Sequence, residues 1–133
     1  MKISTIIKNK FNKNEVIVTT NEQSKKIQIP SKESGYGSFL NGGELLLLSM
    51  AVCYCNDIYR EAAKRNIKIV DVEVEVTGSF GGEGDPGTNF EYKPRIKSNA
   101  SKEELHQLII DTDRIAEIHK TLRQGIDIRL KYE

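Results

Sequence analysis

The feature that most constrains the fold of this chain is a run of apolar residues near its middle, from Leu45 to Cys55, which only Ser49 interrupts. A run of this kind has to be buried, yet it is well short of the ~20 apolar residues that a helix needs to cross a bilayer. We therefore expect a segment of the protein core, and no membrane as a partner.

The residues on both sides of this run indicate a helix. Asn41, followed three residues later by Glu44, matches a capping box, and neither proline nor glycine occurs from Glu44 to Arg65. Asn66 is a residue at which such a helix can stop. The first half of the helix is apolar on every side, whereas the second half is amphipathic. Because a chain of 133 residues has few layers with which to cover it, we expect a second subunit to supply part of the cover.

The segments around the helix have the patterns of strands. Residues 2–30 contain three short stretches rich in Ile, Val and Thr, which predict an antiparallel meander. After a loop rich in Ser, Gly and Asn and then the helix, valines alternate with acidic residues in 67–80, and 90–99 follows as a partner strand. The order of elements predicts a single α+β domain over residues 1–133.

The last third of the chain predicts a helical region and a final strand. Ser101 and Glu104 form a second capping box, and apolar residues follow at helical spacing, with a break near 111–113 that divides the region into two helices. Gly125 is the expected C-cap. Apolar and polar residues then alternate in 126–132, which predicts a strand.

Charge and cysteine content narrow the choice of partner and compartment. Lys plus Arg number 20 and Asp plus Glu number 19, so the chain has no electrostatic reason to bind nucleic acid. The N-terminus MKISTIIKNK lacks the hydrophobic region of a signal peptide, which favours a cytoplasmic protein. The two cysteines do not form a disulfide framework, so we expect both thiols to be reduced.

Cys53 and Cys55 are the first candidates for chemistry. Residues two apart on a helix point about 200° from each other, so the two thiols leave opposite faces and cannot bridge unless the helix unwinds. Each is either a small core residue or, if a cation or donor lowers its pKa, a nucleophile. No cation lies within one turn of Cys53 in the sequence, so an activating group has to come from elsewhere in the fold or from a second chain.

The sequence predicts neither a metal site nor a cofactor. No CxxC or HxxxH spacing occurs, and the glycines of 78–87 precede a strand, whereas phosphate-binding glycine motifs open a helix. His119 could serve as a general base, and His106 lies in the same helical region, but histidines of amphipathic helices are more often surface or boundary residues.

Taken in order, these motifs resemble the OsmC/Ohr family of osmotically inducible and organic hydroperoxide resistance proteins. In that family an ELLL-type run leads to a cysteine nine positions after the glutamate, as Glu44 leads to Cys53 in ELLLLSMAVC. The resemblance covers approximately residues 38–130. It implies antiparallel sheets packed around a long central helix, and an intertwined homodimer with active sites at the subunit interface.

The resemblance also implies an activity. In active relatives the helix cysteine attacks an organic hydroperoxide and becomes a sulfenic acid, which condenses with a second cysteine before a dithiol reductant resets the pair. Cys53 matches the attacking cysteine, and Glu44 is the candidate for the family's glutamate. The implied theme is the response to oxidative stress, with Cys53 as a redox cysteine.

This chain departs from the family pattern at several positions. Aligning AEIHKTLRQG with the family's CPVxxTLxxG segment puts Ala116 at the resolving cysteine and Glu117 at the proline. The family's thiolate-stabilising arginine in the N-terminal strands is also missing, because the first arginine of this chain is Arg60. Lys8, Lys10 or Lys13 could substitute for the missing arginine as point charges, without the forked geometry of a guanidinium.

Two hypotheses follow. In the first, a homodimer reduces organic hydroperoxides through Cys53, and an external thiol completes the reaction. In the second, a catalytically degenerate dimer of the same fold binds a small apolar ligand or has a structural role. A Cys53→Ser variant separates them, since only the first predicts a loss of hydroperoxide consumption.

Overall fold

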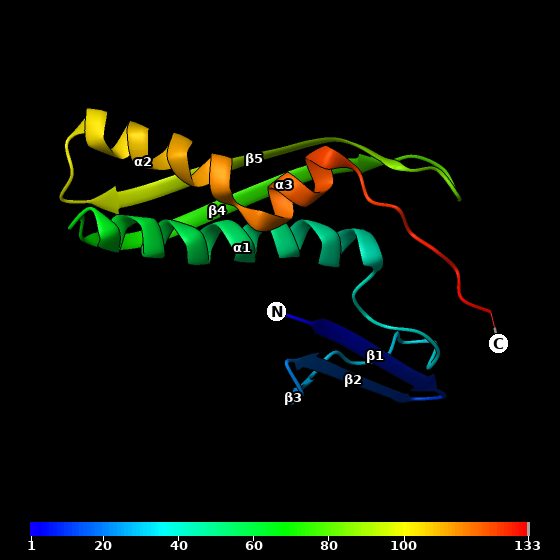
Figure 1. Cartoon of the computed structure of the whole chain (residues 1–133). Helices are drawn as coiled ribbons and strands as arrows, with labels where there is room; N and C mark the ends of the chain where they lie inside the picture. Colours follow the sequence, from blue (N-terminus) through cyan, green and yellow to red (C-terminus); the bar gives the residue numbers. More distant parts are fainter. Residues whose placement is uncertain (133) are drawn as a thin grey trace. The chain divides into compact units, whose positions relative to one another are not determined.

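The computed structural model of the protein describes residues 1–132 and divides into two compact units, whose boundary along the chain lies between Leu45 and Leu46 (Figure 1). Each unit is described by itself. That the whole chain is one domain stays a prediction.

The first unit is a three-stranded antiparallel sheet. Its strands are β1 (Ile3–Lys10), β2 (Lys13–Thr20) and β3 (Gln23–Ile27), in the order β1-β2-β3. The turns between them depend on residues with positive φ, Asn12 at 56° and Asn21 at 47°, because asparagine tolerates the left-handed region better than most residues. The predicted meander is confirmed.

The long helix α1 (Gly42–Lys64) has the ends that the sequence predicts. The backbone N–H of Glu44 donates to Asn41 Oδ1 at 2.8 Å, and the backbone N–H of Asn41 donates to Glu44 Oε2 at 3.2 Å, so both halves of the capping box are present. After the helix, Asn66 adopts a φ of 55°, which turns the chain toward the next strand.

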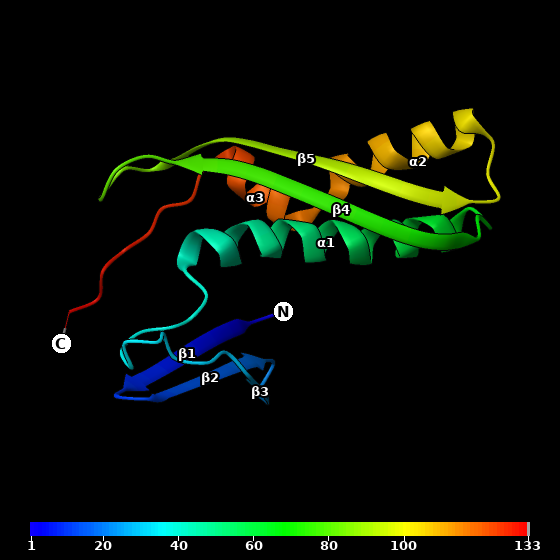
Figure 2. The same ribbon diagram turned by 180° about the vertical axis from the view of Figure 1, so that it is seen from behind.

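The second unit packs helices against a hairpin. The strands β4 (Ile69–Phe80) and β5 (Gly87–Ser98) pair in antiparallel fashion, and α2 (Lys102–Ile115) and α3 (Glu117–Gln124) follow. Figure 2 shows the two strands in front of the helices, so the helices share one face of the hairpin. The alternation in β4 explains this, since Val72, Val74 and Val76 are half-buried on the helix side while the acidic residues between them are exposed.

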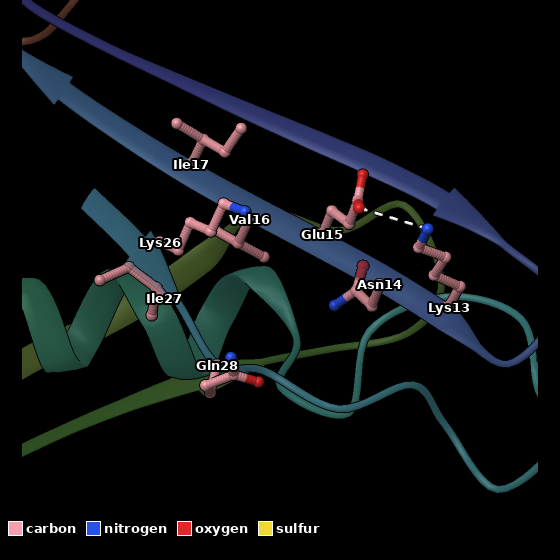
Figure 3. Close-up of a pocket in the computed structure, with 8 residues that line it drawn as sticks. All are labelled: Lys13, Asn14, Glu15, Val16, Ile17, Lys26, Ile27 and Gln28. Carbon is pink, nitrogen blue, oxygen red and sulfur yellow. Dashed lines mark ion pairs between the residues drawn. The ribbon is translucent and has the colours of Figure 1, made fainter. Parts of the chain in front are cut away.

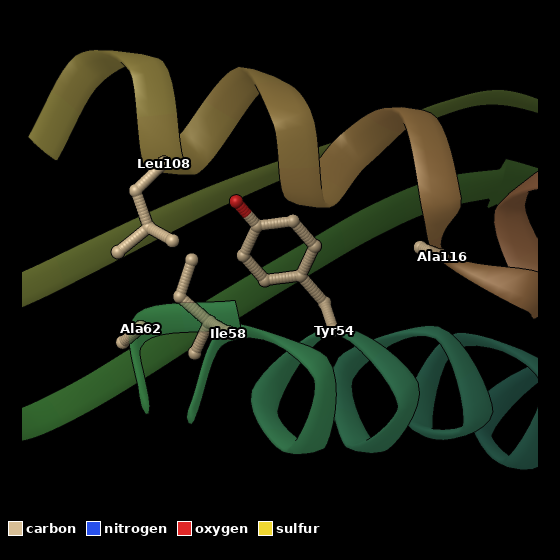
Figure 4. Packing of buried hydrophobic residues seen from close by; sticks show 5 residues of the cluster. All are labelled: Tyr54, Ile58, Ala62, Leu108 and Ala116. Atoms are coloured by element: carbon tan, nitrogen blue, oxygen red, sulfur yellow. The ribbon is translucent and has the colours of Figure 1, made fainter. Parts of the chain in front are cut away.

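The core of this unit lies between α1 and α2, with side chains of the β4–β5 hairpin packed against it (Figure 4). Tyr54 is fully buried, and its hydroxyl donates to the carbonyl oxygen of Ile109 at 2.9 Å, which ties α1 to α2. The fully or almost fully buried members of this core are Tyr54, Ile58, Ala62, Leu108 and Ala116.

Two features of the C-terminal third differ from the sequence prediction. The break between the helices falls at Ala116, which has a φ of −58° and a ψ of 114°, and not at 111–113. The strand predicted for 126–132 does not form, because a strand needs a pairing edge and this segment has none within the described residues. Ile128 and Leu130 are accordingly 86% and 89% exposed.

The helices of residues 1–132 include none with the length and apolar character that spanning a bilayer requires.

Candidate functional site

The thiol of Cys53 lies between two carboxylates. Its sulfur is 3.7 Å from Asp57 Oδ2, one turn further along α1, and 3.7 Å from Glu117 Oε2, at the start of α3, so the single thiol proton can be donated to either carboxylate. The break at Ala116 is what brings Glu117 here, because α3 begins at the next residue and directs its first turn toward α1.

Arg60 supplies the positive charge of this site. Its Nη1 is 3.2 Å from Asp57 Oδ1 and 3.7 Å from Glu117 Oε1. Cys53, Asp57 and Arg60 stand at i, i+4 and i+7, so they share one face of α1. Arg60 lies two turns from Cys53, so it is not among the residues within one turn of the thiol. The helical spacing from Cys53 to Asp57 and from Asp57 to Arg60 nevertheless indicates it in the sequence.

The charges around Cys53 favour a protonated thiol. Burial raises the pKa of the Cys53 thiol; the backbone N–H of Ile118 opposes that rise, and the carboxylates of Asp57 and Glu117 add to it. The pKa of Asp57 is also raised, by burial and by the neighbouring Glu117 carboxylate, against the effect of Arg60. The site therefore holds a thiol next to a carboxylate that accepts protons more readily than an ordinary aspartate.

The start of α3 faces the sulfur. Ala116, its N-cap residue, makes no side-chain capping bond, so the first backbone N–H groups of the helix are available to other acceptors. The N–H groups of Ile118 and Glu117 lower the thiol pKa, as a helix N-terminus does for a cysteine placed against it. The two carboxylates counteract this effect.

A divalent cation is the ligand that this cluster could hold in place of protons. Single ligand atoms of Cys53, Asp57 and Glu117 lie within 4.8 Å of one another. Thiolate and carboxylate together suit a metal such as zinc. The guanidinium of Arg60 already contacts both carboxylates, however, and its charge opposes a second cation there.

The other residues that the sequence singles out lie in different settings. The carboxylate of Glu44 accepts from the backbone and side-chain N–H groups of Asn41 at 3.2 Å each, so the structure places it in the cap of α1. Cys55 is a free, half-buried thiol. His106 is exposed on α2.

His119 is a buried residue, not a surface one. It is 2% exposed, and neither ring nitrogen has a hydrogen-bond partner among the described residues. Its ring meets that of Tyr92 edge-on with centroids 4.6 Å apart, and that of Tyr54 at 6.0 Å. Burial lowers the pKa of His119 and Arg123 lowers it further, so this histidine is neutral at pH 7.

The first unit carries hollows of a different character. The one in Figure 3 has a volume of about 430 Å³ and is lined by β2, β3 and the residue after it, with an ion pair between Lys13 and Glu15 at 3.4 Å. A second hollow of about 540 Å³ is lined mainly by aliphatic side chains, including Ile7, Val18 and Leu40. Neither contains a thiol or a histidine.

Comparison with known families and structures gives one consistent result. The family model described as OsmC-like protein matches residues 35–131. An OsmC-like protein from Mycoplasma pneumoniae shares 18% identity and a TM-score of 0.65, over 90% of this chain and 87% of that one. A comparison with curated proteins found no match.

Two further structures with this fold have names that refer to hydroperoxides. An OsmC-like hydroperoxide resistance protein from Jannaschia sp. CCS1 has 19% identity and a TM-score of 0.61, over 98% of this chain and 92% of that one. The organic hydroperoxide resistance protein OhrB of Bacillus subtilis has 14% identity and a TM-score of 0.57, over 98% and 97%. At such identities the likeness shows the fold.

Proposed function

This chain belongs to the OsmC-like protein family, and we propose that it reduces organic hydroperoxides through Cys53, with an external thiol as the reductant. The observation that carries the proposal is the contact of the Cys53 thiol with one carboxylate oxygen of Asp57, while Arg60 forms an ion pair with the other oxygen. The hydroperoxide resistance proteins that share the fold support the choice of substrate.

The proposed reaction begins from the thiol and not from a preformed thiolate. Sulfur attacks the terminal peroxide oxygen while the thiol proton passes to Asp57, and the O–O bond breaks. The alkoxide that leaves takes this proton, so that RSH and R′OOH become RSOH and R′OH. Asp57 suits the transfer because its raised pKa makes it a better proton acceptor than an ordinary aspartate.

The second half of the cycle needs a reductant from outside the chain. Ala116, at the family's resolving position, carries no thiol. One external thiol therefore condenses with the sulfenic acid to form a mixed disulfide and water. A second external thiol then attacks the mixed disulfide, which restores the Cys53 thiol and joins the two external thiols in a disulfide. We expect slow turnover, because the thiol pKa is raised.

The proposal includes a homodimer in the cytoplasm. Leu48 and Val52, on the apolar half of α1, are 51% and 50% exposed, and a second subunit would cover such a surface. A catalytic role for Glu44 rests on the family spacing alone and stays part of the proposal.

The second candidate is a protein without peroxidase activity that binds a small apolar ligand. The aliphatic hollow of about 540 Å³ in the first unit favours it, because ligand sites are typically apolar and of roughly 300–1,000 Å³. The raised pKa of Cys53 also favours it.

Hydroperoxide consumption by matched variants tests the proposal. Purified protein is incubated with cumene hydroperoxide and excess dithiothreitol, and the remaining peroxide is measured against a protein-free control. We expect Cys53→Ser to abolish consumption and Cys55→Ser, the neighbouring thiol, to retain it. A wild-type rate equal to that of Cys53→Ser would contradict the proposal and leave the second candidate.

A further inference from the structure

A network of three residues holds α3 at the end far from Cys53. Asp113, near the end of α2, accepts hydrogen bonds from the hydroxyl of Tyr92 on β5 and from the guanidinium of Arg123 on α3. The Nη2 of Arg123 is 2.8 Å from Asp113 Oδ1, and its Nη1 is 3.3 Å from Oδ2, so the pairing is bidentate. We call Tyr92, Asp113 and Arg123 the α3 anchor.

The charge of Asp113 persists at neutral pH. Burial opposes it, but the hydrogen bonds from Arg123 and Tyr92 hold the pKa of Asp113 below its usual range. The anchor therefore joins a strand and two helices through one ionised carboxylate, and only Arg123 of its members belongs to α3.

The other end of α3 builds part of the Cys53 environment. Glu117 reaches the sulfur at 3.7 Å, and the backbone N–H of Ile118 faces it. Because α3 is one helix of 8 residues, its orientation decides where both groups lie. Its N-cap Ala116 makes no side-chain capping bond, so besides the anchor α3 is held by the buried ring of His119 and by the contact of Glu117 with Arg60 at 3.7 Å.

We propose that Asp113 is a positioning residue for the Cys53 site: it fixes α3 through Arg123 and Tyr92, and α3 in turn fixes Glu117 and the backbone N–H of Ile118 at the thiol. The inference rests on the site of the proposed function but not on hydroperoxide as its substrate.

Loosening α3 changes both the exposure and the ionisation of the Cys53 thiol. Glu117 of α3 contacts the sulfur at 3.7 Å, so displacement of the helix opens the thiol to reagents. Burial raises the thiol pKa most; the backbone N–H of Ile118, second in size, lowers it, whereas the Glu117 carboxylate raises it. A loosened α3 should therefore make the thiol more accessible and change the pH at which it ionises.

Alkylation of Cys53 tests this inference. The rate with iodoacetamide is measured from pH 6 to 10 in a Cys55→Ser background, for Asp113→Asn and for the matched control Asp111→Asn. Asp111 lies two residues earlier on α2 and pairs with Arg65 at 2.9 Å, away from the anchor. We expect Asp113→Asn to alkylate about threefold faster or more at pH 7 because its thiol is more accessible, with a pH profile displaced from that of the parent, and the control to stay near the parent.

A folded Asp113→Asn variant with the rate and pH profile of its parent would overturn the inference. If Asp113→Asn does not fold, Arg123→Gln removes the other half of the bidentate pair at a side chain that is 55% exposed, and the same two outcomes apply. Because the readout is alkylation, a wild-type protein that consumes no hydroperoxide would refute the proposed function and leave this inference standing.

Discussion

Replacing Glu117 by glutamine should make Cys53 more reactive. The substitution keeps the shape of the side chain and an oxygen that can accept the thiol hydrogen bond, but it removes one of the two negative charges beside the sulfur. A thiolate at Cys53 would then form with less electrostatic repulsion, while Arg60 keeps its contact with Asp57 at 3.2 Å.

The size of the effect follows from the distance and the exposure. Two unit charges about 4 Å apart interact with about 1 kcal/mol in bulk water and about 4 kcal/mol near a protein surface. Because the side chain of Glu117 is 64% exposed, the value for water is the appropriate one. About 1 kcal/mol corresponds to roughly a fivefold faster alkylation at pH 7.

The assay is iodoacetamide alkylation followed by intact-mass spectrometry, in a Cys55→Ser background so that one thiol reports. Glu103→Gln is the matched control, since it makes the same change of charge in the first turn of α2. If Glu117→Gln and Glu103→Gln alkylate at the same rate, the carboxylate does not act on the thiol and the electrostatic account of the site is wrong.

Two other predictions concern stability. Leu108→Ala removes a fully buried side chain from the core between α1 and α2, and we expect it to lower the free energy of unfolding by about 3 kcal/mol in urea titrations; a loss below about 1 kcal/mol would mean that the core closes around the gap. The pKa of His119 is lower in the folded chain than in the unfolded chain. As the pH falls through about 6.5, the unfolded chain therefore takes up a proton at this residue before the folded chain does, and the free energy of unfolding should decrease. His119→Phe should reduce the loss of stability between pH 7.5 and 5.5, whereas His106→Gln, at an exposed position, should not; equal losses in all three proteins would contradict the assignment.

Local features of the fold are predictable from the sequence because their causes are local. Asn41 with Glu44, and Ser101 with Glu104, satisfy helix ends within three residues, and both capping boxes form. The alternating valines of β4 likewise indicate which face of the hairpin is buried. These signals need no knowledge of distant residues.

The candidate site is less predictable because its parts come from distant positions. Glu117 contacts Cys53 across 64 residues of chain, and no spacing rule connects them. The sequence predicts the helix break near 111–113, because aspartates are poor helix formers. Both aspartates instead have partners that keep them helical, Arg65 for Asp111 and Arg123 for Asp113. The strand expected in 126–132 shows the same limit, since alternation indicates a strand but does not supply an edge to pair with.

The packing of Tyr54 against Tyr92, with ring centroids 5.0 Å apart, also gives the protein a spectroscopic probe. The chain has five tyrosines and no tryptophan, so tyrosine dominates its near-ultraviolet circular dichroism. Only immobilised rings give a strong signal there, and these two belong to the second unit, whereas Tyr36 of the first unit is 64% exposed. Loss of the tyrosine band while the far-ultraviolet spectrum persists would therefore mark loosening of the second unit by itself.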